Sequence, residues 1–478
     1  MSGKQLSEGE ARSASPELSS TAASDLDENY DVYKQHNGEP IDPAKSKAVL
    51  RKINLRLIPT LWLLYLLQYL DKNGYLAGQY PAGFLMQELP LGKFLAGTCV
   101  TWGVILMTTP ACTNFAGIAT NRSLLGFVEA AVNPGFVLMM GMWYVSAEQP
   151  LRLEAYYCTN GIATMFGGLI GYAIGHINGV LARWMYVFII FGSCSLAAGV
   201  YAFIVLPDLP SKAKFLNPRE RYIAVERVAR NRQGVKNSKF SRHQAMQTLY
   251  DPKTWILFMM AVGVQVPNSA LTSFTSLIIK SFGFDTLGTQ YLQIPGGAVQ
   301  FLSLLGGGFI CTKFPNVRCI TMIVANLICI LGSGLLVGLP DSNKWGRLVA
   351  IWLCYFQGIG FSMSLTMISS NIGGFTKKQL TGVIIFTDYC IVNIIGPQTF
   401  KDNESPGYHS AYIAMLVGYS VKLTAVCVLY FYMWSVNEQR DRAPAASGLS
   451  REEEEKAAIE NGMHDMTELD NRGFRYVL

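Results

Sequence analysis

The chain has 478 residues, of which 50% are apolar and only 15% are charged. A soluble globular protein carries about 25% charged residues, so this chain lacks the polar surface that such a protein needs, and lipid is expected around most of it. Its ten cysteines are scattered without a C-x-x-C pair, which excludes a secreted fold held together by disulfides.

Both ends of the chain are acidic and poor in apolar residues. Residues 1–44 hold nine acids against three bases, and residues 443–478 hold eight against four. Neither segment can bury enough apolar surface to fold alone, so we expect disordered cytoplasmic tails over 1–44 and 437–478. The net charge of +6 comes from the membrane-embedded middle, where nucleic acid is not an expected partner.

The first apolar stretch covers residues 57–90 and is interrupted by Asp71, Lys72 and Glu88. Two full membrane helices with a connection need about 45 residues, so this stretch is too long for one helix and too short for two. The basic segments on either side of it are expected on the same face of the membrane, so it must cross an even number of times. The sequence therefore predicts a compressed hairpin of two truncated spans.

Ten longer apolar stretches follow, each long enough to cross a membrane. They cover residues 94–112, 117–144, 154–176, 184–206, 255–279, 290–311, 319–338, 347–369, 380–400 and 410–434. With the hairpin they make twelve spans, six on each side of a basic loop. The expected architecture is an all-α membrane protein of two six-helix bundles, 45–206 and 254–436, joined by the cytoplasmic loop 207–253.

Lysine and arginine divide unevenly between the two sets of loops. One set, which includes residues 45–56 and 207–253, carries 24 of them, and the other set carries five. Positive residues concentrate on the cytoplasmic side, so both termini and the basic loop are expected there. Within the loop, Asn217-Pro218 suits the start of a helix that runs to about Arg232.

The fourth span carries an arginine and a glutamate on one face. At 100° per residue, Arg122, Gly126, Glu129 and Asn133 fall within a narrow arc that must avoid lipid. Arg122 and Glu129 are about 10 Å apart along the axis, too far for a tight pair. Either one holds an anion while the other takes up a proton, or both belong to a charge network between helices.

Other polar residues also lie within predicted spans. Asp388 is either a functional acid or a buried neutral carboxyl, and Lys422 either pairs with a neighbouring helix or meets substrate. Asp71 and Lys72 are either functional or the turn of the hairpin. Amides on several helices suit a polar central cavity, although such groups also bond helices to one another. The candidate substrate-binding amides are Gln265, Asn268, Gln293, Gln300 and Asn393.

Enzyme motifs are missing from the sequence. It contains no G-x-x-x-x-G-K-[ST], G-x-S-x-G or H-E-x-x-H, and its five histidines are scattered. We therefore expect neither an enzyme nor a metal or cofactor site. Without a phosphate-binding loop, transport would be driven by a gradient rather than by ATP.

Several segments resemble a known family. Six spans on each side of a basic loop, together with Arg122-x3-Gly126-x2-Glu129-Ala130, resemble the major facilitator superfamily. Further segments are similar to its fungal allantoate permease family of anion:cation symporters. They include Tyr69-Leu70-Asp71-Lys72-Asn73, Leu89-Pro90-Leu91-Gly92-Lys93, Asp251-Pro252-Lys253-Thr254-Trp255, Asn393-Ile394-Ile395-Gly396-Pro397-Gln398 and the final Phe474-Arg475-Tyr476-Val477-Leu478.

The resemblance implies proton-coupled symport of a small organic anion, in a family that handles allantoate, nicotinate and other vitamins. By this analogy Lys72 and Arg122 would attract the carboxylate and Glu129 would carry the proton, with Asp388 as a second candidate. It also implies a monomer in the plasma membrane. The sequence departs from the family between about Asn73 and Leu76, where the end of helix one and the start of helix two are missing.

Two other functions stay open on the sequence. The same fold exports metabolites, because sequence does not determine direction, and the shortened hairpin leaves room for a non-transporting paralogue. Asn403-Glu404-Ser405 in a predicted outer loop matches the glycosylation pattern. Asn121-Arg122-Ser123 matches it too but lies within a span, so we expect only Asn403 to be glycosylated.

Overall fold

The computed structural model of the chain describes residues 27, 29–35, 41–70, 79–174, 176–177, 179–233, 236–237, 239–404, 407–442 and 451–478. The regular structure in these residues is helical. A first bundle contains α2 (Pro43–Leu70), α3 (Gln79–Glu88), α4 (Leu91–Thr108), η3 (Thr109–Ala111), α5 (Phe115–Glu129), α6 (Val132–Trp143), α7 (Gln149–Tyr157), α8 (Thr159–Ile174) and α9 (Arg183–Val205).

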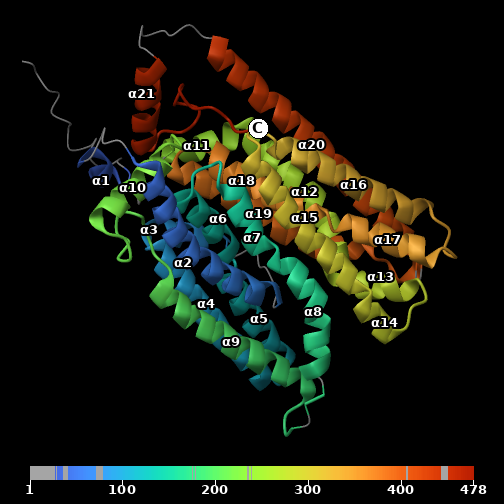
Figure 1. Cartoon of the computed structure of the whole chain (residues 1–478). Helices are drawn as coiled ribbons and strands as arrows, with labels where there is room; N and C mark the ends of the chain where they lie inside the picture. Colours follow the sequence, from blue (N-terminus) through green and yellow to red (C-terminus); the bar gives the residue numbers. More distant parts are fainter. Residues whose placement is uncertain are drawn as a thin grey trace, which may run out of the picture.

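The second bundle lies beside the first (Figure 1). It contains α12 (Pro252–Ser273), α13 (Thr275–Ser281), α14 (Thr286–Tyr291), α15 (Gln293–Lys313), α16 (Arg318–Gly338), α17 (Lys344–Cys354), α18 (Gln357–Asn371), α19 (Phe375–Ile395), η4 (Gly396–Thr399), η5 (Asp402–Glu404) and α20 (His409–Arg442). The two bundles are the architecture that the sequence predicts.

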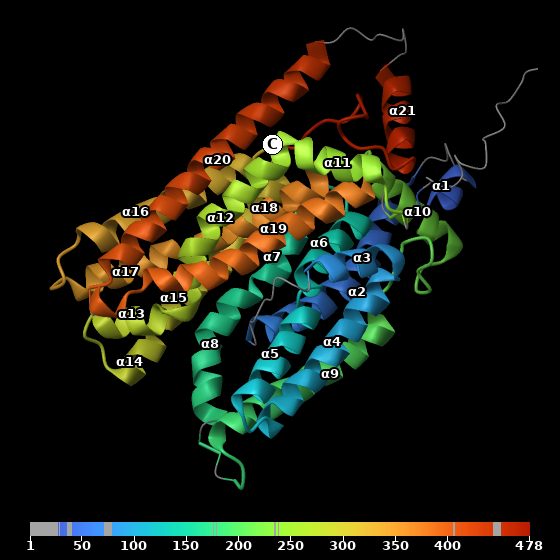
Figure 2. The ribbon, with the colours of Figure 1, turned by 180° about the vertical axis from the view of Figure 1, so that it is seen from behind.

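Four further helices gather at one end of the molecule, which we call the loop end (Figures 1 and 2). They are α1 (Tyr30–Gln35), α10 (Pro218–Ala229), α11 (Arg242–Tyr250) and α21 (Arg451–Met463). Helix α10 begins at the predicted Asn217-Pro218 pair, because Asn217 and Glu220 form a reciprocal capping box.

Within the described residues, nine helical segments are long and apolar enough to cross a membrane. Three of the twelve expected spans are not among them. The first corresponds to α2. This helix is 28 residues long, but its first half contains the basic segment 45–56, and the apolar part follows it. The second corresponds to the ten residues of α3, a length of about 15 Å, whereas the hydrocarbon core is about 30 Å thick. The fifth is divided into α7 and α8.

The tails differ from the prediction. Disorder was expected over 1–44 and 437–478, but α20 continues to Arg442, Tyr33 of α1 is 8% exposed, and Glu468 and Asn471 are completely buried. That prediction is wrong for the described parts of both tails. Neither tail is isolated in the folded protein, and acids of the second tail pair with bases of the basic loop and the second bundle.

The two bundles contact each other at the loop end. Ser369 of α18 donates a hydrogen bond to the side chain of Gln149 on α7 at 2.6 Å. The basic loop contacts the second bundle at the same end, because the Gln233 amide donates to the carbonyl oxygen of Ser370 at 2.5 Å. The structure is therefore closed at this end.

Helices α8 and α15 also touch across the bundle boundary, nearer the middle of the membrane spans. A Cβ on Gly161 would lie 2.6 Å from the carbonyl oxygen of Gly297, and a Cβ on Gly297 would lie 2.7 Å from that of Gly161. Only glycine at both positions permits this backbone-to-backbone approach.

Candidate functional site

A cavity lies between the two bundles. Its empty space is about 860 Å³, including the part open to solvent, which is within the range of small-molecule sites. Helices of both bundles line it. The lining residues are Tyr65, Gln68, Tyr69, Glu129, Ala130, Asn133, Tyr157, Asn160, Val264, Gln265, Asn268, Gln300, Gln357, Gly358, Phe361, Phe386, Tyr389 and Cys390.

Four amide side chains that line the cavity have buried carbonyl oxygens without a hydrogen-bond partner among the described residues. They are Gln68, Asn133, Asn160 and Gln300. Buried polar atoms are normally paired, so these oxygens are available to accept hydrogen bonds from a ligand or from water. Other lining amides bond to one another instead: Asn268 donates to Gln265 at 2.9 Å, and Gln357 donates to Asn268 at 3.3 Å.

Glu129 is the last residue of α5 and is 5% exposed, with its side chain on the cavity. The helix breaks directly after it, because Pro134 has no N–H to donate to the carbonyl of Ala130. Of the lining residues that the structure describes, Glu129 is the one acid, and none is lysine or arginine. A carboxyl at this depth in a membrane protein indicates a functional site.

Aromatic rings cross the bundle boundary beside the cavity. The ring centres of Tyr65 and Tyr157 are 4.6 Å apart, those of Tyr157 and Phe361 are 6.1 Å apart, and those of Phe361 and Tyr389 are 6.0 Å apart. All four residues line the cavity. They provide flat apolar faces against which a planar ligand can pack.

The structure brings four of the predicted site residues together on this cavity, namely Glu129, Gln265, Asn268 and Gln300. Gln293 and Asn393 are not among the lining residues. The Gln293 amide donates to the Ser276 hydroxyl at 3.1 Å, and the Asn393 amide donates to its own helix at Tyr389. Lys72 lies outside the described residues.

The two charged residues Arg122 and Asp388 also lie away from the cavity lining. The guanidinium of Arg122 lies 4.9 Å from the centre of the Phe188 ring on α9, whereas Glu129 and Asn133 of the same predicted face reach the cavity. Asp388 is 2% exposed, and its Oδ2 has no hydrogen-bond partner in the described part of the chain. Its neighbours Phe386 and Tyr389 line the cavity, so Asp388 is on another face of α19.

Sequence reasoning missed several residues. Tyr65 and Gln68 are three residues apart on the span that was expected to be short, and Asn160 lies at the start of the Gly-rich fifth span. Glu154 was also missed, although it is an acid at the end of a predicted span. It is completely buried in α7, and an acid within a span was the available signal.

The predicted glycosylation site is exposed. Asn403 lies in η5, directly before α20, at the end of the bundle away from the loop end. The third residue of its motif, Ser405, lies outside the described residues.

Two helical bundles on either side of a polar cavity are typical of a multi-pass membrane transporter. The model of the Major Facilitator Superfamily matches residues 58–397. The chain is 34% identical to an uncharacterized transporter of Schizosaccharomyces pombe, over 90% of this chain and 87% of the relative. The chain belongs to the major facilitator superfamily.

A relative with a stated activity is the allantoate permease of Saccharomyces cerevisiae, which is 27% identical over 95% of this chain and 90% of its own length. Among solved structures, the proton:xylose symporter XylE superimposes with a TM-score of 0.58 at 11% identity, over 79% of this chain and 86% of XylE. This likeness concerns the fold alone. The match to the allantoate permease of Saccharomyces cerevisiae confirms the resemblance that the sequence motifs indicate.

Proposed function

We propose that the protein is a secondary active transporter that couples the entry of protons to the uptake of a small organic anion. The observation that carries the proposal is the position of Glu129, a buried acid on a cavity between two bundles. In a transporter whose bundles rock about a central site, such a carboxyl can take a proton from one side and release it on the other.

The cavity suggests the chemistry of the substrate. Four of its amide oxygens have no partner among the described residues and can accept hydrogen bonds, so they favour a compound with several N–H groups, such as a ureide or an amide. The likeness to allantoate permease supports the same class. The anionic charge would be met by Lys72, which remains a prediction from the sequence.

A second candidate function rests on the aromatic lining. Six aromatic rings and one carboxylate on the described lining, with no lysine or arginine among the residues there, favour a neutral or cationic nitrogen heterocycle. Glu129 would then meet the substrate itself rather than the coupling proton.

The test is uptake into proteoliposomes with an acidic exterior. Labelled allantoate and nicotinate represent the anions, and thiamine represents the cations. We expect accumulation of an anion that an ionophore for protons abolishes. Glu129→Gln should lose pH-driven accumulation and keep exchange of labelled for unlabelled substrate, because exchange needs no net proton movement. Unchanged accumulation would refute the coupling role, and thiamine uptake that Glu129→Gln abolishes together with exchange would favour the second candidate.

The direction and location of transport are part of the proposal. The 24-to-5 division of lysine and arginine favours a cytoplasmic loop end, and the family resemblance favours a monomer in the plasma membrane. Efflux from preloaded vesicles with no uptake would instead support the exporter alternative, and inertness to every probe in both directions would support the non-transporting one.

A further inference from the structure

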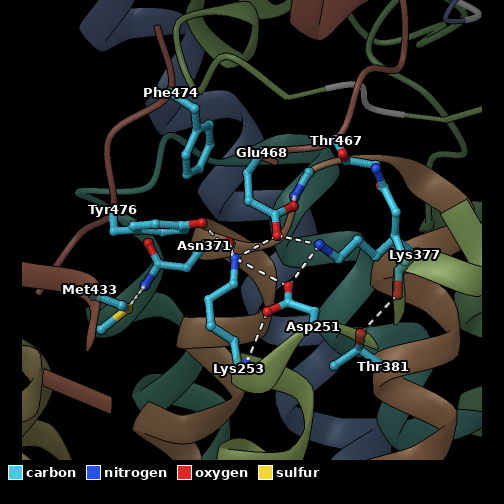
Figure 3. Close-up of polar contacts among 12 residues, drawn as sticks. Asp251, Lys253, Asn371, Lys377, Thr381, Met433, Thr467, Glu468, Phe474 and Tyr476 are labelled. Atoms are coloured by element: carbon cyan, nitrogen blue, oxygen red, sulfur yellow. Dashed lines mark hydrogen bonds and ion pairs between the residues drawn. The ribbon is translucent and has the colours of Figure 1, made fainter. Parts of the chain in front are cut away.

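The C-terminal segment 464–478 is held to the second bundle by a buried cluster of four charges (Figure 3). The carboxylate of Glu468 lies 2.5 Å from the ammonium groups of both Lys253 and Lys377. Asp251 lies 2.7 Å from Lys377 and 3.4 Å from Lys253, and all four side chains are at most 1% exposed. Burial alone raises the pKa of Glu468, but the two ammonium groups outweigh it and hold that pKa at about 2.

Paired backbone contacts extend this attachment to the end of the segment. The Asn371 side chain donates to the carbonyl oxygen of Val477 and accepts from its N–H, both at 2.8 Å. Asn437 makes the same two-way contact with Tyr476 at 2.9 Å. The attachment to the second bundle therefore combines buried ion pairs with backbone hydrogen bonds.

The other side of the segment contacts the basic loop. Arg232 donates to the carbonyl oxygen of Gly473 at 2.6 Å and lies 3.0 Å from the carboxylate of Glu455 on α21. Met463 of the same helix is buried against Val225 of α10.

The basic loop is in turn held to the first bundle. Arg227 of α10 pairs with Glu148 at 2.8 Å. Asn231 accepts from the N–H of Ser146 at 2.8 Å and donates to the carbonyl oxygen of Tyr144 at 3.1 Å. The C-terminal segment and the loop thus form one continuous connection between the bundles across the closed loop end.

We propose that the C-terminal segment 464–478 is an intramolecular latch that holds the loop end closed and must separate from the basic loop before that end can open. Rocking of one bundle against the other moves the two attachments apart, so one contact in the connection has to break. The segment also contacts the loop through Asp465, which accepts hydrogen bonds from Gln244 at 3.1 Å and Asn237 at 3.3 Å. We expect the contact at Arg232 to break before these buried bonds, because the side chains of Arg232 and Glu455 are 25% and 59% exposed.

Native Cys311 reports on the latch. It is 5% exposed and lines the same cavity as Phe474, Val477 and Ser146, where the segment meets both bundles. Cys329 and Cys354 are completely buried elsewhere in the second bundle, so they react only if the bundle unfolds. Alkylation of each cysteine by N-ethylmaleimide is measured by peptide mass spectrometry on the full-length protein in lipid nanodiscs.

Arg232→Ala removes the ion pair with Glu455 and the hydrogen bond to Gly473, and leaves the bonds from the loop to Asp465 in place. Glu468→Gln weakens the attachment to the bundle. Both should raise the alkylation rate of Cys311 by about tenfold, with Cys329 and Cys354 still unreactive. Arg230→Ala is the matched control, because Arg230 lies two residues before Arg232 on the basic loop and pairs within its own helix region with Glu226, at 3.9 Å, rather than with the C-terminal segment. It should leave the rate within about twofold of the wild type.

Three results would overturn the latch: an unchanged Cys311 rate in Arg232→Ala, an equal rise in Arg230→Ala, or a rise in Arg232→Ala accompanied by reaction of Cys329 and Cys354. The measurement needs no substrate. A latch that is refuted therefore leaves the proposed transport untouched, and transport that is refuted leaves the latch testable.

Discussion

Ser362 on α18 donates a hydrogen bond at 2.5 Å to the carboxylate of Glu154 on α7, across the boundary between the two bundles. The second carboxylate oxygen of Glu154 has no partner among the described residues. A Cβ on Gly308 would lie 2.9 Å from the Glu154 side chain, so α15 also packs directly against it. This acid therefore depends on one hydroxyl group from the opposite bundle.

Removing that hydroxyl should destabilise the protein. We expect Ser362→Ala to cost about 1–3 kcal/mol and to lower the melting temperature, because the buried carboxyl loses its donor. In a Glu154→Leu background the same change should cost little, since the Ser362 hydroxyl otherwise serves only its own helix. Intrinsic-fluorescence melting of the purified variants measures this coupling. Ser364→Ala is the control on the same helix; an equal cost of Ser362→Ala in both backgrounds would contradict the prediction.

Asp465 should make the stability of the packed C-terminal segment depend on pH. Burial raises the pKa of this carboxyl from 3.8 to about 6, against hydrogen bonds from Phe375 and Gln244 that lower it. A group whose pKa is raised in the folded state stabilises most below pH 3.8, and this contribution is lost as pH rises through about 6. Asp465→Asn imitates the protonated form at every pH.

The variant should therefore melt at the same temperature as the wild type near pH 4 and at a higher temperature near pH 7.5. Scanning fluorimetry across this range is the measurement. Asp470→Asn is the matched control, because the side chain of Asp470 is 38% exposed. If Asp465→Asn melts lower than the wild type at pH 7.5, the ionised carboxylate is the stabilising form and the predicted sign is wrong.

Two glutamines on α15 should behave differently in transport. Gln300 lines the cavity with an unpartnered oxygen, whereas Gln293 is bonded to Ser276 outside the lining. We expect Gln300→Met to reduce uptake by about tenfold through a higher KM, because one hydrogen bond to the substrate is lost. Its melting temperature should not change. Gln293→Met should leave KM unchanged; an equal effect of both variants would show that α15 packing, not substrate binding, is responsible.

Asn403 should carry a glycan when the chain is expressed in a eukaryotic host. It is exposed, and it lies at the end of the bundle opposite the loop end, which we expect outside the cell from the proposed orientation. Removal of N-glycans should then shift the mobility of the wild type but not of Asn403→Gln. Asn121 matches the same motif but is buried, with its amide bonded to Thr108 at 2.8 Å, so it should stay unmodified. A mobility shift that persists in Asn403→Gln would show that Asn121, the other residue that matches the motif, is modified instead.

The pattern of apolar runs was enough to predict two bundles and a short second span, because each run is bounded by charges or by glycine and proline. Helical periodicity was enough to predict that Glu129 faces the interior, because it lies on the same side of its helix as Gly126 and Asn133. Periodicity gives a direction around one helix and nothing about depth, so Arg122 was placed on the same face as Glu129 although it reaches Phe188 instead.

The order in the C-terminal tail could not be predicted from the tail itself. Glu468 becomes structured because Lys253 and Lys377, more than 90 residues away along the chain, provide its partners. Composition predicts whether a segment can fold in isolation, but the C-terminal segment is ordered by its contacts with the rest of the protein.

When the bundles rock, we expect them to pivot about the contact between Gly161 and Gly297. With no side chains between the two backbones, the bundles can tilt there without interlocking, yet they cannot move apart as a whole without losing this contact. In such a motion, opening of the molecule at one end is accompanied by closing at the other end. A compound that strengthens the connection at the loop end would act at a distance, by keeping the central cavity facing the opposite side of the membrane.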